Sequence, residues 1–283
     1  MSAVPPAPQA RATSKAAGIP GIKHVIAVAS GKGGVGKSTT SCNLALGFAA
    51  MGLKAGILDA DIYGPSQPKL FGLRGKPRQL GGGRLEPLER FGVKVMSIGF
   101  LVEEDLAMIW RGAMVIQAIT QMLQQVAWGE LDILVIDLPP GTGDAQLTIA
   151  QQVPLAGALI VSTPQDLALI DAKRAIAMFD KVKIPILGLI ENMSGFCCPE
   201  CNEVTPIFGH GGARKEAETR GIPWLGGIPL DINIRATSDE GRPIVAIEPD
   251  TAQAIRYVGM ARSIWSTIMS GAASRPAPRI VIE

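Results

Sequence analysis

The chain has 283 residues, with 27 lysines and arginines against 25 acidic residues, and it contains four cysteines and two histidines. A chain of this length forms one or two domains and buries a full hydrophobic core. Its net charge of +2 excludes a protein that attracts nucleic acid through bulk charge. Four cysteines are too few for a disulfide scaffold and favour a reducing compartment, so we expect a cytoplasmic protein. We find neither the long apolar run of a membrane span nor the apolar segment of a secretory signal.

Short apolar runs alternate with longer helical patterns along most of the chain. The runs that predict strands lie at 25–29, 55–58, 93–98, 131–136, 158–162, 184–190 and 224–228. Helical patterns lie at 37–51, 114–128, 167–180 and 251–269. Continuously apolar strands separated by helices predict an α/β fold, in which a mostly parallel sheet carries helices on both faces.

Three segments lack these patterns. Residues 1–20 are rich in alanine and proline and predict a disordered tail, because prolines interrupt an amphipathic helix. A transit segment is the alternative there, since the stretch is basic and free of acids. Residues 72–90 are polar and glycine-rich and predict a mobile connector. We therefore expect one domain over residues 21–272 and a C-terminal tail over residues 273–283.

A phosphate-binding loop is predicted between the first strand and the first helix. The segment 31–38 (GKGGVGKS) matches the pattern GxxxxGK[ST] in that context. Glycines let backbone N–H groups curl around an anion, and the helix N-terminus adds its positive end. Lys37 is expected on the β- and γ-phosphates, and the Ser38 hydroxyl on Mg²⁺. The residues expected to hold the nucleotide are Gly33, Gly34, Val35, Gly36, Lys37, Ser38 and Thr39.

Acidic residues follow two of the predicted strands. Asp137 ends the run 131–136, where a carboxylate can hold Mg²⁺ directly or through water. Gly141 follows in a loop whose backbone can approach the γ-phosphate closely. Asp59 and Asp61 come directly after the run 55–58. For each aspartate, capping of the next segment is the alternative interpretation.

Cys198 and Cys201 form a CxxC pair, which places two thiols on one tight turn. Tetrahedral sulfur ligation of zinc or of an iron–sulfur cluster takes four thiolates, and one chain supplies two in this spacing. A symmetric dimer would supply four, so we expect the metal to bridge two copies. Cys197 is a spare thiol or an alternative ligand, but adjacent residues cannot readily face one metal together.

The sequence from about residue 23 to 247 resembles the Mrp/ApbC family of iron–sulfur cluster carrier ATPases, within the MinD/ParA-like P-loop proteins that have a deviant Walker A motif. The resemblance rests on the phosphate loop and the CxxC pair, and on the segments 59–66, 137–144, 191–194 and 207–212. It implies a slow ATPase that binds Mg–ATP and holds a labile 4Fe–4S cluster across a homodimer. The partners it implies are an assembly scaffold and the apoproteins that receive the cluster.

The same resemblance assigns roles to single residues. Lys32 would reach the phosphates bound by the partner copy, and Asp61 would orient the attacking water. Asp59 would lie nearer the metal. Asn192 resembles the asparagine that reads adenine, and a turn residue is the alternative. Asp231 lies in a segment that resembles the loop covering the base, and capping of a following helix is its alternative.

Two other functions compete with the carrier. A positioning ATPase of the ParA/MinD kind needs a basic DNA-binding face or a terminal amphipathic helix for membranes. The prolines in segment 273–279 and the small net charge argue against both, so we expect neither nucleic acid nor membrane as partner. An ATPase whose dimer is held by zinc is the other alternative, because zinc and iron–sulfur clusters share thiolate ligands.

Overall fold

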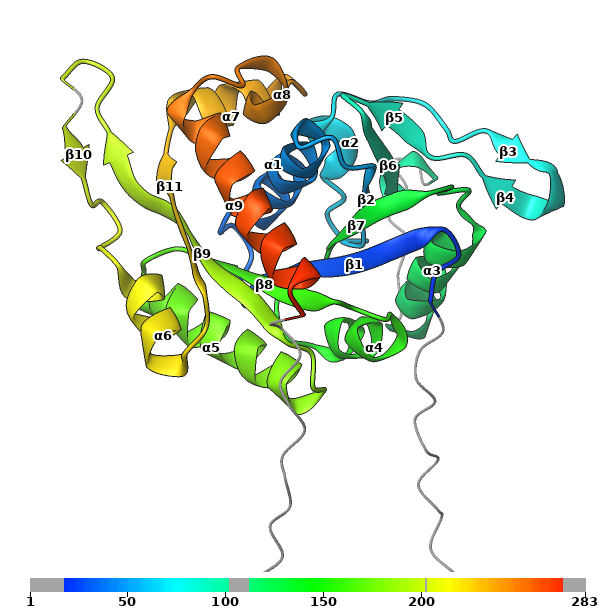
Figure 1. The fold of residues 1–283 in the computed structure, drawn as a ribbon, viewed down its shortest axis with the longest axis horizontal. Coiled ribbons are helices and arrows are strands. Elements are labelled where there is room, and N and C mark those ends of the chain that lie inside the picture. The colour runs from blue at the N-terminus through cyan, green and yellow to red at the C-terminus, as the bar shows by residue number, and fades with distance from the viewer. Residues whose placement is uncertain (1–17, 102–111, 202, 272–283) are drawn as a thin grey trace, which may run out of the picture.

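A mixed nine-stranded sheet forms the centre of the computed structural model, which describes residues 18–101, 112–201 and 203–271 (Figure 1). The strand order is β10-β9-β8-β1-β7-β2-β6-β5, and β11 pairs with β9 beside this path. The strands are β1 (Ile22–Ala29), β2 (Ala55–Asp59), β5 (Leu88–Arg90), β6 (Val93–Ser97), β7 (Leu131–Asp137), β8 (Gly157–Ser162), β9 (Ile186–Cys197), β10 (Val204–Thr205) and β11 (Trp224–Leu230).

The interior strands are parallel. β1 pairs with β7 and β8, β2 with β6 and β7, and β9 with β8 and β11, all in parallel register. The two short strands β5 and β10 are antiparallel additions at the edges. Central strands such as β2 and β8 are buried along their whole length, which explains their unbroken apolar sequences.

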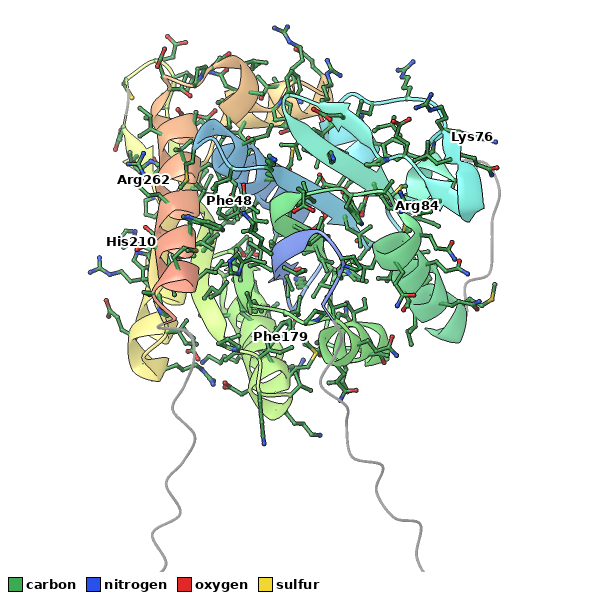
Figure 2. The ribbon with its side chains drawn as sticks, turned by 45° about the vertical axis from the view of Figure 1, so that its right-hand side comes forward. Phe48, Lys76, Arg84, Phe179, His210 and Arg262 are labelled. Carbon is green, nitrogen blue, oxygen red and sulfur yellow. The ribbon has the colours of Figure 1, made fainter. Side chains whose placement is uncertain are left out.

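Helices cover both faces of the sheet (Figure 1). A group that includes α1, α8 and α9 packs on one face, where α1 and α8 both contact α9. Helices α3, α4, α5 and α6, each in contact with the next, cover the other face. Phe48 of α1 and Phe179 of α5 are fully buried in the two layers (Figure 2). The predicted α/β fold is confirmed. The helices are α1 (Lys37–Ala50), α2 (Gln67–Leu70), α3 (Gly112–Gln125), α4 (Asp144–Gln152), α5 (Asp166–Lys181), α6 (Gly212–Arg220), α7 (Ile232–Asp239), α8 (Ile244–Ile247) and α9 (Ala252–Met269).

The segment 72–90, predicted as a mobile connector, contains regular secondary structure. It holds the hairpin of β3 (Gln79–Leu80) and β4 (Arg84–Leu85), which projects from the body with Lys76 and Arg84 at its surface (Figures 1 and 2). The stretch then adds β5 to the sheet edge, because Phe91 and Gly92 both take left-handed φ angles of 53° and 74° and form a tight turn to β6. Polar strands at an edge lack the apolar run that identifies a buried strand.

The predicted tails, 1–20 and 273–283, lie outside the described residues except for residues 18–20. Among the described helices, none has the length and apolar character needed to cross a membrane.

Candidate functional site

The phosphate loop links β1 to α1, and glycine is required at its last turn. Gly34 and Gly36 have φ angles of 80° and 79°, and a Cβ atom on Gly36 would lie 2.1 Å from the Asn192 amide nitrogen. No described side chain caps the first turn of α1. Its N–H groups therefore face the loop with the positive end of the helix dipole, as an anion site requires.

Lys37, the first residue of α1, forms a buried ion pair with Asp137 at the end of β7. Its Nζ atom lies 2.5 Å from Asp137 Oδ1, and the two side chains are 6% and 0% exposed. Lys37 Nζ also lies 3.2 Å from Ser38 Oγ. Ser41 Oγ donates to Asp137 Oδ1 at 2.9 Å, and Gln67 Nε2 donates to Oδ2 at 2.9 Å. The lysine and the aspartate, expected on phosphate and on Mg²⁺ respectively, thus neutralise each other here.

Asp59 ends β2 directly beside Asp137 in the parallel register. Its Oδ2 atom accepts hydrogen bonds from the backbone N–H groups of Ser66 and Gln67 and from Ser97 Oγ, at 2.9, 3.0 and 3.0 Å. Burial and the nearby Asp137 charge raise the pKa of Asp59 to about 7. These bonds make Asp59 the anchor of the segment that follows β2.

Asp61 and Gly141 lie in the loops after β2 and β7. Asp61 is partly exposed, and burial raises the pKa of its carboxyl. Gly141 has a φ of 100°, which suits glycine, and its N–H donates to the Ser30 carbonyl at 2.9 Å. In this conformation its amide is therefore bonded to the loop itself.

A cavity of about 490 Å³ lies beside the phosphate loop. Asn192 and Asp231 both line it, together with Thr39, Phe196 and Tyr257. Asn192 Nδ2 donates to the Val35 carbonyl at 2.8 Å, so the strand β9 is tied to the loop. The apolar walls and few polar groups suit a flat heterocyclic base.

Asp231 caps α7, as the alternative interpretation expected. Its Oδ1 atom accepts from the N–H groups of Asn233 and Ile234 at 2.8 and 3.1 Å, and Oδ2 accepts from Gln253 Nε2 at 2.6 Å. The capping bonds and the place in the cavity wall are compatible, because a residue that begins a helix also lies at the end of β11.

The other side of the loop is open to solvent. Lys32 and Gly33 are exposed and line a hollow of about 210 Å³ together with Gly34, Thr163 and Phe208. No described carboxylate forms an ion pair with Lys32. The two loop lysines therefore point into different surroundings.

Cys198 and Cys201 follow β9 in the connection to β10, and β9 and β10 form a hairpin that projects from the sheet (Figure 1). Cys198 N–H donates to the Glu203 carbonyl at 2.9 Å, and Cys201 is exposed. Hydrogen bonds from the backbone of Cys201 and Glu200 lower the pKa of Cys198, which favours the thiolate that a metal binds. Cys197 lies in the strand itself, opposite Val204. No three His, Cys, Asp or Glu side chains of the described part form a metal-binding group.

Three residues that contribute to the site were not predicted from the sequence. Ser41 follows Lys37 by one helical turn, a spacing that could have identified it. Gln67 and Tyr257 carry no such signal, because α2 and α9 reach the site only through the tertiary fold.

A family described as the NUBPL iron-transfer P-loop NTPase, of the ParA type, matches residues 21–265. The chain belongs to this family. A relative from Arabidopsis thaliana, named iron–sulfur protein required for NADH dehydrogenase, mitochondrial, is 54% identical over 86% of this chain and 78% of its own length. A relative from Aquifex aeolicus, named iron–sulfur cluster carrier protein, is 49% identical over 89% of this chain and 70% of its own length. The resemblance to the cluster carriers is confirmed.

Solved structures agree with the fold. A nucleotide-binding protein from Archaeoglobus fulgidus, in complex with ADP and with cobalt, is 45% identical, with a TM-score of 0.72 over 84% of this chain and 92% of that protein. The septum site-determining protein MinD from Pyrococcus horikoshii, in complex with Mg–ADP, has a TM-score of 0.63 over 90% of this chain and 100% of its own. Since MinD is 20% identical, it shows the fold alone. The chain is thus a nucleotide-binding P-loop protein of the iron–sulfur carrier family.

Proposed function

We propose that this protein hydrolyses ATP and carries a 4Fe–4S cluster, held between the Cys198 and Cys201 thiols of two copies, to recipient apoproteins. The single observation that carries the proposal is that one chain joins a complete phosphate loop to a projecting CxxC hairpin through strand β9. The cluster is the cargo. The name of the Arabidopsis relative mentions NADH dehydrogenase, so iron–sulfur apoproteins of that kind are the proposed class of recipient.

The phosphate loop supplies the nucleotide site. The groups proposed for Mg²⁺ are the Ser38 hydroxyl and the Asp137 carboxylate, hard oxygen donors that fit this ion. Asp137 is fully buried, so its carboxylate needs another cation when Lys37 turns to phosphate, and this need supports the assignment. When bound, Mg²⁺ would neutralise phosphate charge. Lys37 would exchange Asp137 for the β- and γ-phosphates.

Two residues are proposed for the chemical step. Lys32 is exposed on the open side of the loop, and from there it would reach phosphates bound by the second copy. An added cation there stabilises the charge that develops on the γ-phosphoryl oxygens. Asp61, whose pKa is raised, would orient the water that attacks phosphorus, while Gly141 would let the backbone approach the γ-phosphate.

The cavity is proposed for the base. Asn192 offers a donor and an acceptor, which match N1 and N6 of adenine. Asp231 would hold the wall that closes over the base. Loop residues 33–39 would surround the phosphates with backbone N–H groups.

The two-copy cluster follows from the count of thiols. Four thiolates are needed, and the CxxC pair of one chain provides two. Exposure of Cys201 at the tip of a hairpin leaves room for the same pair from a second copy. The proposed role of Lys32 and the count of thiols both support a homodimer, and they do so through unrelated residues.

Anaerobic reconstitution with iron and sulfide tests the proposal. The wild type should hold about two irons per chain, half of a cluster shared by two copies, and should elute as a dimer. Cys198→Ala and Cys201→Ala should lose the bound iron. Cys42→Ala is the matched control, because Cys42 is fully buried in α1.

A full cluster in both hairpin variants would refute the proposed cargo site. Stoichiometric zinc with no iron, in protein purified without oxygen, would favour the zinc-bridged dimer instead. ATP hydrolysis, measured separately, should stay intact in the two cysteine variants.

A further inference from the structure

Gln67 links the phosphate loop, β2 and β7 through one residue. Its backbone N–H donates to Asp59 Oδ2 at 3.0 Å. Its side-chain Nε2 donates to Asp137 Oδ2 at 2.9 Å and to the Ser38 carbonyl at 3.1 Å. The side chain is fully buried. One amide thus contacts both residues proposed as Mg²⁺ ligands, Ser38 and Asp137.

The other end of the amide has no protein partner. Both bonds of Nε2 run to oxygen acceptors, which fixes the orientation of the amide. Gln67 Oε1 is buried and accepts no hydrogen bond from any described residue. Ser66 Oγ, the neighbouring hydroxyl in the chain, is likewise buried without a partner. An unsatisfied buried acceptor is unfavourable in itself, so it indicates a ligand or a water that belongs there.

The partners of Asp137 divide between its two oxygens. Lys37 and Ser41 contact Oδ1, whereas Gln67 is the partner of Oδ2. When Lys37 turns to phosphate, Ser41 still donates to Oδ1 and Gln67 still donates to Oδ2, so each carboxylate oxygen of Asp137 keeps one donor. The carboxylate then keeps its orientation, and each oxygen retains a free lone pair. Without Gln67, the carboxylate loses the donor on Oδ2 and could rotate about its remaining contact, Ser41, out of the orientation that Mg²⁺ needs.

We propose that Gln67 is a positioning residue for Mg²⁺: its amide orients Asp137 and ties it to Ser38, and its free Oε1 accepts from a water of the ion's hydration shell. The inference rests on the proposed Mg–nucleotide site. It concerns this chain's own residue rather than the phosphate-loop motif, because nothing in the motif requires an amide at this position.

The test separates metal-dependent from metal-independent nucleotide affinity. ADP is titrated calorimetrically into the full chain, once with excess Mg²⁺ and once with EDTA. Gln67→Met keeps the length of the side chain and removes both polar ends. Gln67→Asn keeps the amide but shortens its reach, which covers the case in which the methionine variant does not fold. Ser97→Ala is the matched control, because Ser97 is buried and bonds Asp59 but not Asp137.

Gln67→Met and Gln67→Asn should reduce the Mg²⁺-dependent gain in ADP affinity about tenfold, while affinity in EDTA changes little. Ser97→Ala should leave the Mg²⁺-dependent gain as in the wild type. An unchanged gain in the Gln67 variants, or an equal loss with and without Mg²⁺, would overturn the inference and leave the proposed function standing. A wild type that fails to bind ADP would overturn the proposed function itself.

Discussion

Gly36→Ala tests how tightly the phosphate loop is packed against β9. The native φ of 79° is left-handed, and a Cβ atom there would lie 2.1 Å from Asn192 Nδ2. The substitution must therefore strain the backbone and also displace the Asn192 side chain. Displacement breaks the 2.8 Å hydrogen bond from Asn192 to the Val35 carbonyl.

The two effects have separate sizes. An alanine in the left-handed region costs about 1–2 kcal/mol. A buried group that loses its hydrogen-bond partner costs about 1–3 kcal/mol. We therefore expect Gly36→Ala to lower the free energy of unfolding by about 2–5 kcal/mol. Gly52→Ala should show the backbone part alone, because Gly52 has a φ of 83° and open space around its Cβ position.

Urea denaturation without nucleotide measures both variants. In an Asn192→Ala background the clash is gone, so Gly36→Ala should then cost no more than Gly52→Ala. Equal effects of the two glycine substitutions in the wild-type background would refute the packing argument. A cost of Gly36→Ala that is undiminished in the Asn192→Ala background would refute it as well.

Three further predictions concern buried charge and helix capping. Lys37→Met leaves the buried Asp137 without its cation and should lower the free energy of unfolding by about 3 kcal/mol. The double variant, Lys37→Met with Asp137→Asn, should recover part of this loss. A double variant no more stable than Lys37→Met alone would contradict the prediction. The pKa of Asp59 is raised to about 7 from an ordinary 3.8. The stabilising contribution of Asp59 to the free energy of unfolding is therefore full below about pH 4 and is lost as the pH rises toward about 7. Over that range the stability of the wild type should fall relative to that of Asp59→Asn, and parallel pH profiles from denaturation would count against the shift. Asp231→Ala removes the cap of α7 and should cost about 1 kcal/mol, as measured by thermal unfolding; no change would mean that the capping bonds contribute nothing.

The parallel part of the fold could be predicted from the sequence because its strands are buried on both faces. Continuous apolar runs identified β2, β7 and β8 to within about one residue at each end. Strand β9 runs seven residues beyond its predicted end at Ile190, through a stretch in which polar and apolar residues are mixed. Pairing with β10 and β11 holds this extension, and such pairing depends on distant segments that no local pattern reports.

The sequence indicated several individual residues of the candidate site but not the contacts between them. The motif indicated Lys37, and the end of an apolar run indicated Asp137, a hundred positions away. That these two form an ion pair depends on the adjacency of β1 and β7 in the sheet. The alternatives for Asp231 were not exclusive, since the residue both caps α7 and lines the cavity.

Lys32 and Lys37 belong to one glycine-rich loop, yet the fold gives them opposite surroundings. Lys37 is 6% exposed and already paired, so its proposed contribution to phosphate binding would be the difference between two ion pairs. Lys32 is exposed, and its charge acts through solvent and is weakened by salt. Lys32→Ala should therefore change the free energy of unfolding by less than about 0.5 kcal/mol, unlike Lys37→Met. Any loss of ATP hydrolysis in Lys32→Ala would then reflect the reaction and not the fold. If Lys32→Ala destabilised the chain as much as Lys37→Met, the division between a structural and a solvent-facing lysine would be wrong.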